Sequence, residues 1–430
     1  MKVFKVKKIV VFVVLGLFSG ILSAQTVVID GEIRPRVEYR DGYSKPLLET
    51  NDPGTFSIQR TRLNLSYATA VLNTQITFQD ARTFGQTANS SDVATTGIFE
   101  AWAEMLVLPG GSVKVGRQVL KYDDNRMFSG SVWSNTGTSH DMVLFKYCIN
   151  DFQGHLGFAY NNNSAISSET FYTAGSKYRY MGFLWLTKDL SKSFNLSMLA
   201  VDEGMQTALA STDYGKTISM NHTYTYGGNL KFQHSSLPLG VLATVYFQAG
   251  KNNTGSTMAG KMAAFKVDYK LSAAFSANVG TDYFSGDDNS TDKKQYNFRK
   301  LYGSDHTFNG FMDYWNTPLA QGLLDHYAGL TAKASNKLSL DAAFHLFYAD
   351  KQLKSGTEQV GKDLGSELDL ILNYKMNTQT ALQMGWCCYF TTDNTMIGKG
   401  IAAGATTRTP GWAYVMLTIR PTFFSFNPVK

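Results

Sequence analysis

Asp-Gly-Glu-Ile-Arg-Pro-Arg-Val-Glu-Tyr-Arg, residues 30–40, alternates charged and uncharged side chains at every position. Because successive side chains of a β-strand point to opposite faces, all six charges lie on one face. No soluble β-sandwich needs six charges on one face of one strand. The wall of a water-filled barrel does, because one face meets the lumen and the other meets lipid. The stretch therefore predicts one strand of a transmembrane β-barrel.

Similar alternation recurs along the chain and predicts eighteen strands, an even number that is typical of bacterial single-chain barrels. Polar faces are assigned to the lumen, since a charge at the bilayer midplane costs about 2–4 kcal/mol. The predicted strands are 27–40, 56–67, 71–84, 96–108, 112–122, 139–148, 152–161, 177–189, 193–203, 220–233, 239–250, 259–270, 274–285, 325–333, 337–350, 364–375, 379–391 and 411–423. The fold class is thus an antiparallel up-and-down β-barrel.

The connections between these segments alternate between short and long. Joins such as 68–70 and 109–111 have three to five residues, and between them lie longer joins such as 41–55 and 123–138. Outer-membrane barrels have short periplasmic turns and long extracellular loops, so both termini are expected on the periplasmic side. The longest join, 286–324, is predicted to be an extracellular loop or a loop folded into the lumen.

The first 24 residues have the pattern of an export signal. A lysine-rich start precedes an apolar run of about 14 residues, which is shorter than the ~20 residues that a spanning helix needs. We therefore expect a signal peptide at 1–24 and an outer-membrane barrel at 25–430. Removing the signal removes four lysines and leaves 36 basic against 34 acidic residues, which argues against nucleic-acid binding.

Arginine is concentrated early in the chain, with eight of the twelve arginines before residue 127. Arg34, Arg36, Arg60 and Arg62 share the lumen face of the first two predicted strands. Rings of arginine select anions, and the guanidinium group matches carboxylates. The alternative is that these arginines pair with acids of the wall and brace it, with no net selectivity; the two interpretations remain open. The expected counter-charges are Glu32, Glu38, Glu100, Glu104, Asp123, Asp124, Glu367 and Asp369.

A family resemblance is carried by residues 115–126, Val-Gly-Arg-Gln-Val-Leu-Lys-Tyr-Asp-Asp-Asn-Arg, followed by Trp133 and Asp141. This run resembles the G-R-Q…Y-D-D-x-R…W signature of the alginate-export porin family, and segments 301–313 and 364–370 are similar to the same family. The resemblance implies an eighteen-stranded outer-membrane barrel with an arginine-rich constriction that passes a polyanion. It also implies that Arg117 and Arg126 lie at or near that constriction.

The position of Arg117 is predicted differently by side-chain alternation. Arg117 shares its face with Val113, Val115 and Val119, so strict alternation turns it away from the lumen. A bulge at Gly116 would reverse the phase and turn it inward. The sequence leaves both orientations open.

The predicted function is passive passage of a hydrophilic, anionic solute, such as an acidic polysaccharide or oligosaccharide, across the bacterial outer membrane. The expected partners are outer-membrane lipid, that solute and the barrel-assembly machinery, which recognises an aromatic last strand such as 411–423. An outer-membrane barrel enzyme and a surface-binding structural barrel are the alternatives. No Ser/His/acid spacing suggests catalysis, and no cofactor is expected.

One predicted loop is a candidate Ca²⁺ site. Residues 287–292 are rich in oxygen ligands but lack the glycine and the terminal Glu of an EF-hand loop. A plain solvated loop is the simpler expectation.

Overall fold

The structure is a computed structural model that describes residues 25–86, 96–172, 178–208, 218–234, 236–288, 291–304, 306–402 and 404–427. The expected signal peptide at 1–24 lies outside the described residues.

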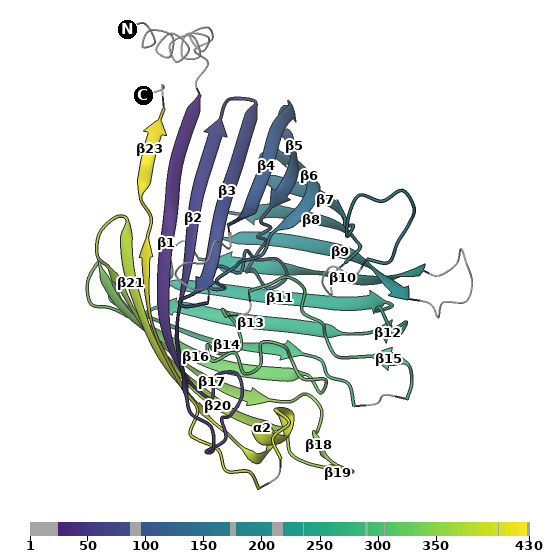
Figure 1. Cartoon of the computed structure of the whole chain (residues 1–430), viewed down its shortest axis with the longest axis vertical. Coiled ribbons are helices and arrows are strands. Elements are labelled where there is room, and N and C mark those ends of the chain that lie inside the picture. Colours follow the sequence, from purple (N-terminus) through teal and green to yellow (C-terminus); the bar gives the residue numbers. More distant parts are fainter. Residues whose placement is uncertain are drawn as a thin grey trace, which may run out of the picture.

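The described ranges form one closed antiparallel barrel of eighteen strands, which confirms the predicted fold class (Figure 1). Strand β1 pairs with β2 on one side and with the final strand on the other, so the sheet has no free edge. The strands are β1 Thr26–Asp41, β2 Gly54–Ala68, β3 Leu72–Thr83, β4 Gly97–Leu108, β5 Gly111–Gln118, β6 His140–Ile149, β7 Phe152–Tyr160, β8 Tyr180–Ser191, β9 Phe194–Ala208, β10 Ile218–Gln233, β11 Leu239–Gly250, β13 Lys261–Lys270, β14 Phe275–Phe284, β16 Leu323–Lys333, β17 Leu338–Tyr348, β20 Asp363–Lys375, β21 Thr380–Phe390 and β22–β23, Gly411–Ile419 with Thr422–Phe426.

The predicted ends shift by a few residues at several strands, and two of these differences have a clear physical reason. The last strand is interrupted at Arg420 and Pro421, because proline has no N–H to give to the ladder. Strand β5 ends at Gln118, four residues earlier than predicted. From there the chain turns inward, where the Val119 N–H donates to the Glu100 carboxylate and Leu120 is buried.

Short turns lie at one end of the barrel together with both termini, and long connections lie at the other (Figure 1). The long connections carry the small elements β12 Thr257–Met258, β15 Lys294–Gln295, β18 Lys354–Ser355, β19 Glu358–Gln359 and helix α2 Asp393–Gly398. In the described ranges no helix has the length and apolar character to cross a membrane.

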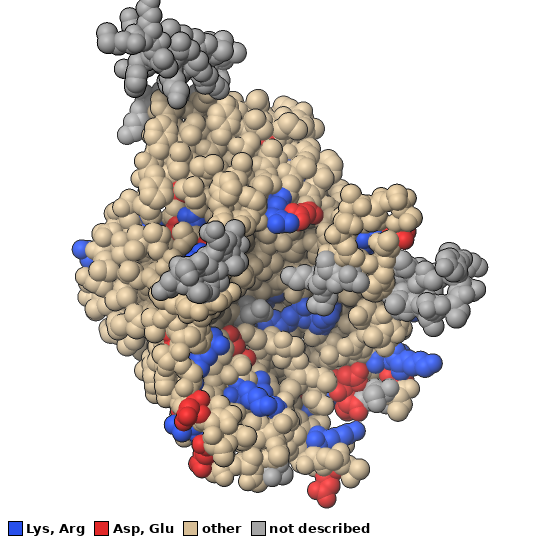
Figure 2. Space-filling model, in the orientation of Figure 1, with Lys and Arg blue, Asp and Glu red and all other residues tan. Residues whose placement is uncertain are grey.

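The outer face of the barrel is apolar and the inner face is polar, as the alternation predicted. Val37, Val115 and Val279 are exposed on the outside, whereas Glu38 and Arg60 are at most 1% exposed on the inside. On the face shown in Figure 2, charged side chains gather in the hollow and around the long-loop end, and the upper strands carry few of them.

Two long connections fold into the lumen. Residues 119–139 follow β5 and residues 285–322 follow β14, and both contribute buried side chains, including Phe128, Met312 and Trp315, to a core inside the barrel. The two segments also bond to each other, since the Tyr302 N–H donates to Met127 O at 2.9 Å. Described residues of the predicted loop 286–324, such as Met312 and Trp315, are buried in this core together with Phe128 of the segment after β5.

The assignment of faces predicts opposite effects at two neighbouring positions of β14. Val279, near the middle of the strand, faces outward, so Val279→Arg should destabilise the folded barrel in a bilayer by about 2–4 kcal/mol. The neighbouring position 278 faces the lumen, so Asn278→Arg is the matched control and should change this stability by less than about 1 kcal/mol. Urea titration in phospholipid vesicles measures both variants, and equal losses would contradict the assigned faces.

Candidate functional site

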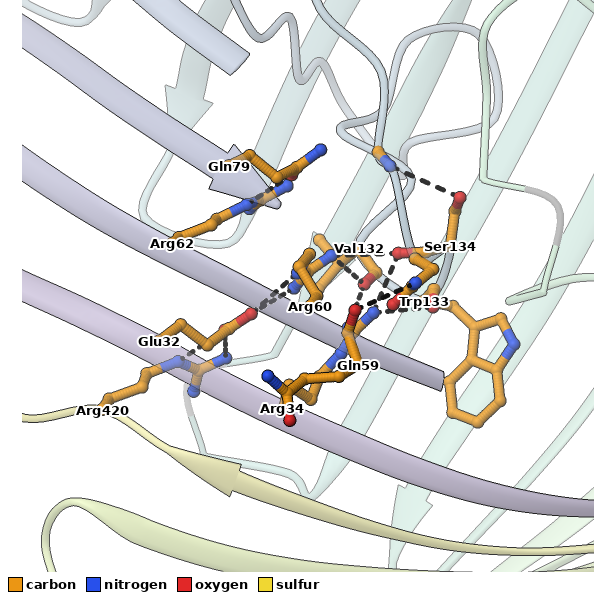
Figure 3. Close-up of polar contacts among 12 residues, drawn as sticks. Glu32, Arg34, Gln59, Arg60, Arg62, Gln79, Val132, Trp133, Ser134 and Arg420 are labelled. Atoms are coloured by element: carbon orange, nitrogen blue, oxygen red, sulfur yellow. Dashed lines mark hydrogen bonds and ion pairs between the residues drawn. The ribbon is translucent and has the colours of Figure 1, made fainter. Parts of the chain in front are cut away.

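Three arginines of the first two strands hold one in-folded segment by its backbone carbonyls, and Figure 3 shows two of them, Arg34 and Arg60. Arg34 donates to the carbonyls of Val132, Trp133 and Ser134 at 2.5–3.1 Å. Arg60 donates to the first and the third of these at 3.1 and 3.0 Å. Arg36 donates to the Trp133 carbonyl at 3.0 Å. Each guanidinium is thereby fixed against residues 132–134.

Two of these arginines, Arg60 and Arg36, are also paired with acids predicted as counter-charges. Arg60 bonds Glu32 Oε1 through two nitrogens at 2.8 and 2.6 Å, and Arg420 bonds the other Glu32 oxygen. Arg36 bonds Glu38 at 2.8 Å. Glu32, Arg36, Glu38 and Arg60 are buried and are part of the packing that holds residues 132–134 in place, whereas Arg420 is exposed. Their geometry matches the bracing interpretation.

Arg126 anchors the in-folded segment to the opposite wall. Its guanidinium bonds both oxygens of Asp282 on β14 at 2.5 and 2.8 Å, and its Nε bonds Asp124 at 2.8 Å. Burial alone lowers the pKa of Arg126, but the two carboxylates outweigh burial and raise it above the ordinary value. Arg126 is therefore charged and fully paired. Burial also raises the pKa of the neighbouring Asp123, whose carboxylate accepts the Trp185 indole N–H at 3.0 Å.

Glu367 and Asp369 of β20 bind the other in-folded segment through its backbone N–H groups. Met312 N–H donates to Glu367 Oε1 at 2.7 Å, and Phe311 N–H donates to Asp369 Oδ2 at 3.3 Å. The chain reaches this close because of Gly310, which has φ +79° and where an added Cβ would lie 2.6 Å from the Glu367 carboxylate. Acids of β20 thus hold N–H groups, and arginines of β1 and β2 hold carbonyls.

Arg117 lies apart from all of these groups, which corrects its assignment to the pore lining. Its side chain is 44% exposed and bonds both oxygens of the exposed Asp141 at 2.8 Å. Val115 lies on the same outward face, while Lys114 and Gln118 point inward. Gly116 has φ +119° but does not reverse the alternation, so strict parity gives the correct orientation and the resemblance does not.

The lumen keeps a cavity of about 400 Å³ between the β2–β7 wall and residues 119–132. Arg62 lines it, with its guanidinium 3.8 Å from the Phe99 ring centroid and its Nε donating to Gln79. Glu100 also lines it. Glu104 lies beside it and accepts a bond from Lys146 Nζ at 2.7 Å.

Three lysines that the sequence analysis did not assign, Lys114, Lys121 and Lys146, share this cavity with Arg62. Lys114 Nζ lies 3.6 Å from the Trp102 ring centroid, and within the described ranges neither Lys114 nor Lys121 forms an ion pair. Parity alone puts Lys114 on the lumen face with Ser112. Lys121 falls in the predicted strand 112–122 on the same face as Val119, whereas the observed strand ends at Gln118.

Within the described ranges, no group of three or more His, Cys, Asp or Glu side chains is arranged to hold a metal ion. Positions 289 and 290 of the loop considered for Ca²⁺ lie outside those ranges.

The arginine contacts predict that Arg60→Ala loosens residues 119–139. Removing one partner of a buried pair costs about 3–5 kcal/mol, although Arg420 still pairs with Glu32. We expect higher single-channel conductance and faster cleavage of this segment by an added protease. Arg117→Ala, which breaks an exposed pair worth about 0.2–1 kcal/mol, is the matched control and should change neither measurement. An unchanged Arg60→Ala channel would contradict the anchoring role.

Comparison with solved structures shows the same barrel fold at very low sequence identity. Pseudomonas aeruginosa OccK11 (OpdR) has a TM-score of 0.62 and 11% identity, covering 95% of this chain and 100% of its own. OccK9 (OpdG) of the same organism has a TM-score of 0.64 and 9% identity, covering 92% and 98%. P. aeruginosa OpdK, solved with vanillate, has a TM-score of 0.60 and 8% identity, covering 92% and 99%.

A search of curated proteins finds no significant match. The profile of the family described as alginate export matches residues 28–402, which span most of the barrel. These residues include the three segments whose resemblance was noted in the sequence. The closed eighteen-stranded barrel and this family match together indicate a porin-like protein of the bacterial outer membrane. It belongs to the alginate export family.

Proposed function

We propose that this barrel is a passive channel for hydrophilic anions and that the basic cavity beside β5 is its selective passage. The observation that carries the proposal is the charge of that cavity. Arg62, Lys114, Lys121 and Lys146 line it together with one carboxylate, Glu100. A net positive lumen surface lowers the electrostatic barrier for anions and raises it for cations.

The arrangement of these cations supports passage rather than permanent neutralisation. Lys146 is offset by Glu104, but Lys114 and Lys121 have no ion-pair partner among the described residues. Their ammonium groups are therefore free to exchange water for a passing carboxylate. By contrast, Arg34, Arg36 and Arg60 are saturated by carbonyls and acids, so they hold the wall of the passage without contacting the solute.

The comparisons agree with this chemistry. The family is described by alginate, an acidic polysaccharide, and the neighbour OpdK was solved with vanillate, a carboxylate. The family description names export, which favours a channel over an enzyme or a surface-binding barrel. An export signal at 1–24 and recognition of the last strand by the barrel-assembly machinery complete the proposal.

The ion selectivity of the purified channel in a planar bilayer tests the proposal. The wild-type reversal potential in a salt gradient should show preference for chloride over potassium. Lys114→Gln with Lys121→Gln removes two unpaired charges, and we expect the anion-to-cation permeability ratio to fall about threefold or more.

Lys188→Gln, which removes an exposed lysine on the outer face of β8, is the matched control and should leave the ratio unchanged. A cation-selective or sealed wild-type channel would overturn the proposed function. A selectivity that survives loss of both cavity lysines would move the selective passage elsewhere in the lumen.

A further inference from the structure

The short-turn rim of the barrel is strongly basic. We define this rim as the eight short turns with two strand residues on each side, residues 67–73, 107–112, 148–153, 190–195, 232–240, 269–276, 332–339 and 374–381, together with 419–421. Its described residues carry six cations and one acid. The cations are Lys192, Lys270, Lys333, Lys337, Lys375 and Arg420, and the acid is Asp151.

The opposite rim has no such bias. The long connection 349–362, for example, mixes Lys351, Lys354 and Lys362 with Asp350 and Glu358. The charge difference between the two ends is therefore a property of the barrel and not of its net charge, which is close to neutral without the first 24 residues. A mouth lined by one sign of charge concentrates counter-ions at that mouth.

Four of the rim cations converge on one recess. A cavity of about 760 Å³ is lined by Lys333, Lys337, Lys375 and Arg420, and its lumen side is formed by the amides of Asn373 and Gln383. The three lysines are exposed, and their ammonium groups form no ion pair with a described residue. The positive charge of Arg420 is partly compensated, because Arg420 forms an ion pair with Glu32 at 3.0 Å.

Within the described ranges no Asp or Glu lines the recess itself, and Asp341 contacts it only through its neighbour Asn373. Asp341 is occupied on both oxygens, by the Thr331 hydroxyl at 2.6 Å and by the Asn373 amide at 2.7 Å. Gln383 continues this polar contact by donating to Asn373 at 2.7 Å. The recess thus presents free ammonium groups at the mouth and hydrogen-bonding amides just inside it.

We propose that this recess is a capture site for a solute that carries several carboxylates along its length, and that such solutes enter the lumen from the short-turn, periplasmic end. Three unpaired lysines on two neighbouring turns engage several anionic groups at once, which a single small anion does not exploit. The inference rests on the proposed function, since capture matters only if the solute then passes the basic cavity.

Binding to the detergent-purified protein is the first test, with a fluorescent oligogalacturonate as the probe. The triple variant Lys333→Gln, Lys337→Gln, Lys375→Gln should weaken binding about tenfold at low salt. The matched control replaces the three lysines of the opposite end, Lys351, Lys354 and Lys362, by Gln and should bind like wild type.

One-sided addition to a single inserted channel is the second test. The probe should block current at about tenfold lower concentration from the short-turn side, and the rim variant should abolish this difference. Equal block from both sides, or unchanged binding by the rim variant, overturns the inference. Binding that persists in phosphatidylcholine nanodiscs but disappears in phosphatidylglycerol nanodiscs assigns the rim to lipid headgroups and also overturns it.

The two proposals fail in distinguishable ways. Loss of probe binding in the rim variant together with a wild-type barrel that conducts no ions would refute the channel and leave the rim site standing. A conducting, anion-selective barrel whose rim variant binds the probe like wild type would refute the rim site and leave the channel standing.

Discussion

The arrangement of this barrel depends on one constraint, which is that charged groups removed from water inside a lumen must be satisfied by other groups of the protein. Arg34 and Arg60 meet it by binding the carbonyls of residues 132–134, and Glu367 meets it by binding the Met312 N–H. The backbone of each in-folded segment supplies the missing partners. The segments are therefore held by the wall charges, and the wall charges are tolerated because the segments are there.

This exchange sorts the lumen charges into two groups with different roles. Saturated groups, such as the Arg126 guanidinium with its two carboxylates, behave as structural fasteners, and a passing ion gains little from them. Unsaturated groups, such as Lys114 beside the Trp102 ring, have no ion-pair partner among the described residues and can accept a carboxylate. In the proposed function the selectivity comes from this second group, so the number of arginines alone does not set the preference for anions.

The sequence predicted the wall well and the interior poorly, for a physical reason. Period-two alternation identified all eighteen strands and the inward faces of Arg34 and Arg60, because lipid on one side and water on the other impose it on every strand. It also oriented Arg117 correctly, where a motif resemblance suggested the lumen. In-folded segments obey no such period. Their course is set by contacts between distant residues, as between Arg34 and residues 132–134, which lie 98 to 100 positions apart, and local patterns do not encode such contacts.

Desolvation of the solute links the two basic regions that remain open to solvent, which are the rim recess and the cavity beside β5. A polyanion loses hydration when it enters a low-dielectric passage, and each carboxylate needs a replacement partner before the next one is desolvated. Lysines at the rim and lysines at the cavity offer such partners in sequence along the lumen, while weak hydration-exchange contacts let the solute leave again. Arginines with their rigid forks would hold carboxylates more tightly. Arg34, Arg36 and Arg60 bind backbone carbonyls, whereas the cavity lysines and Arg62 face the open space, and the proposed anion path uses this second set.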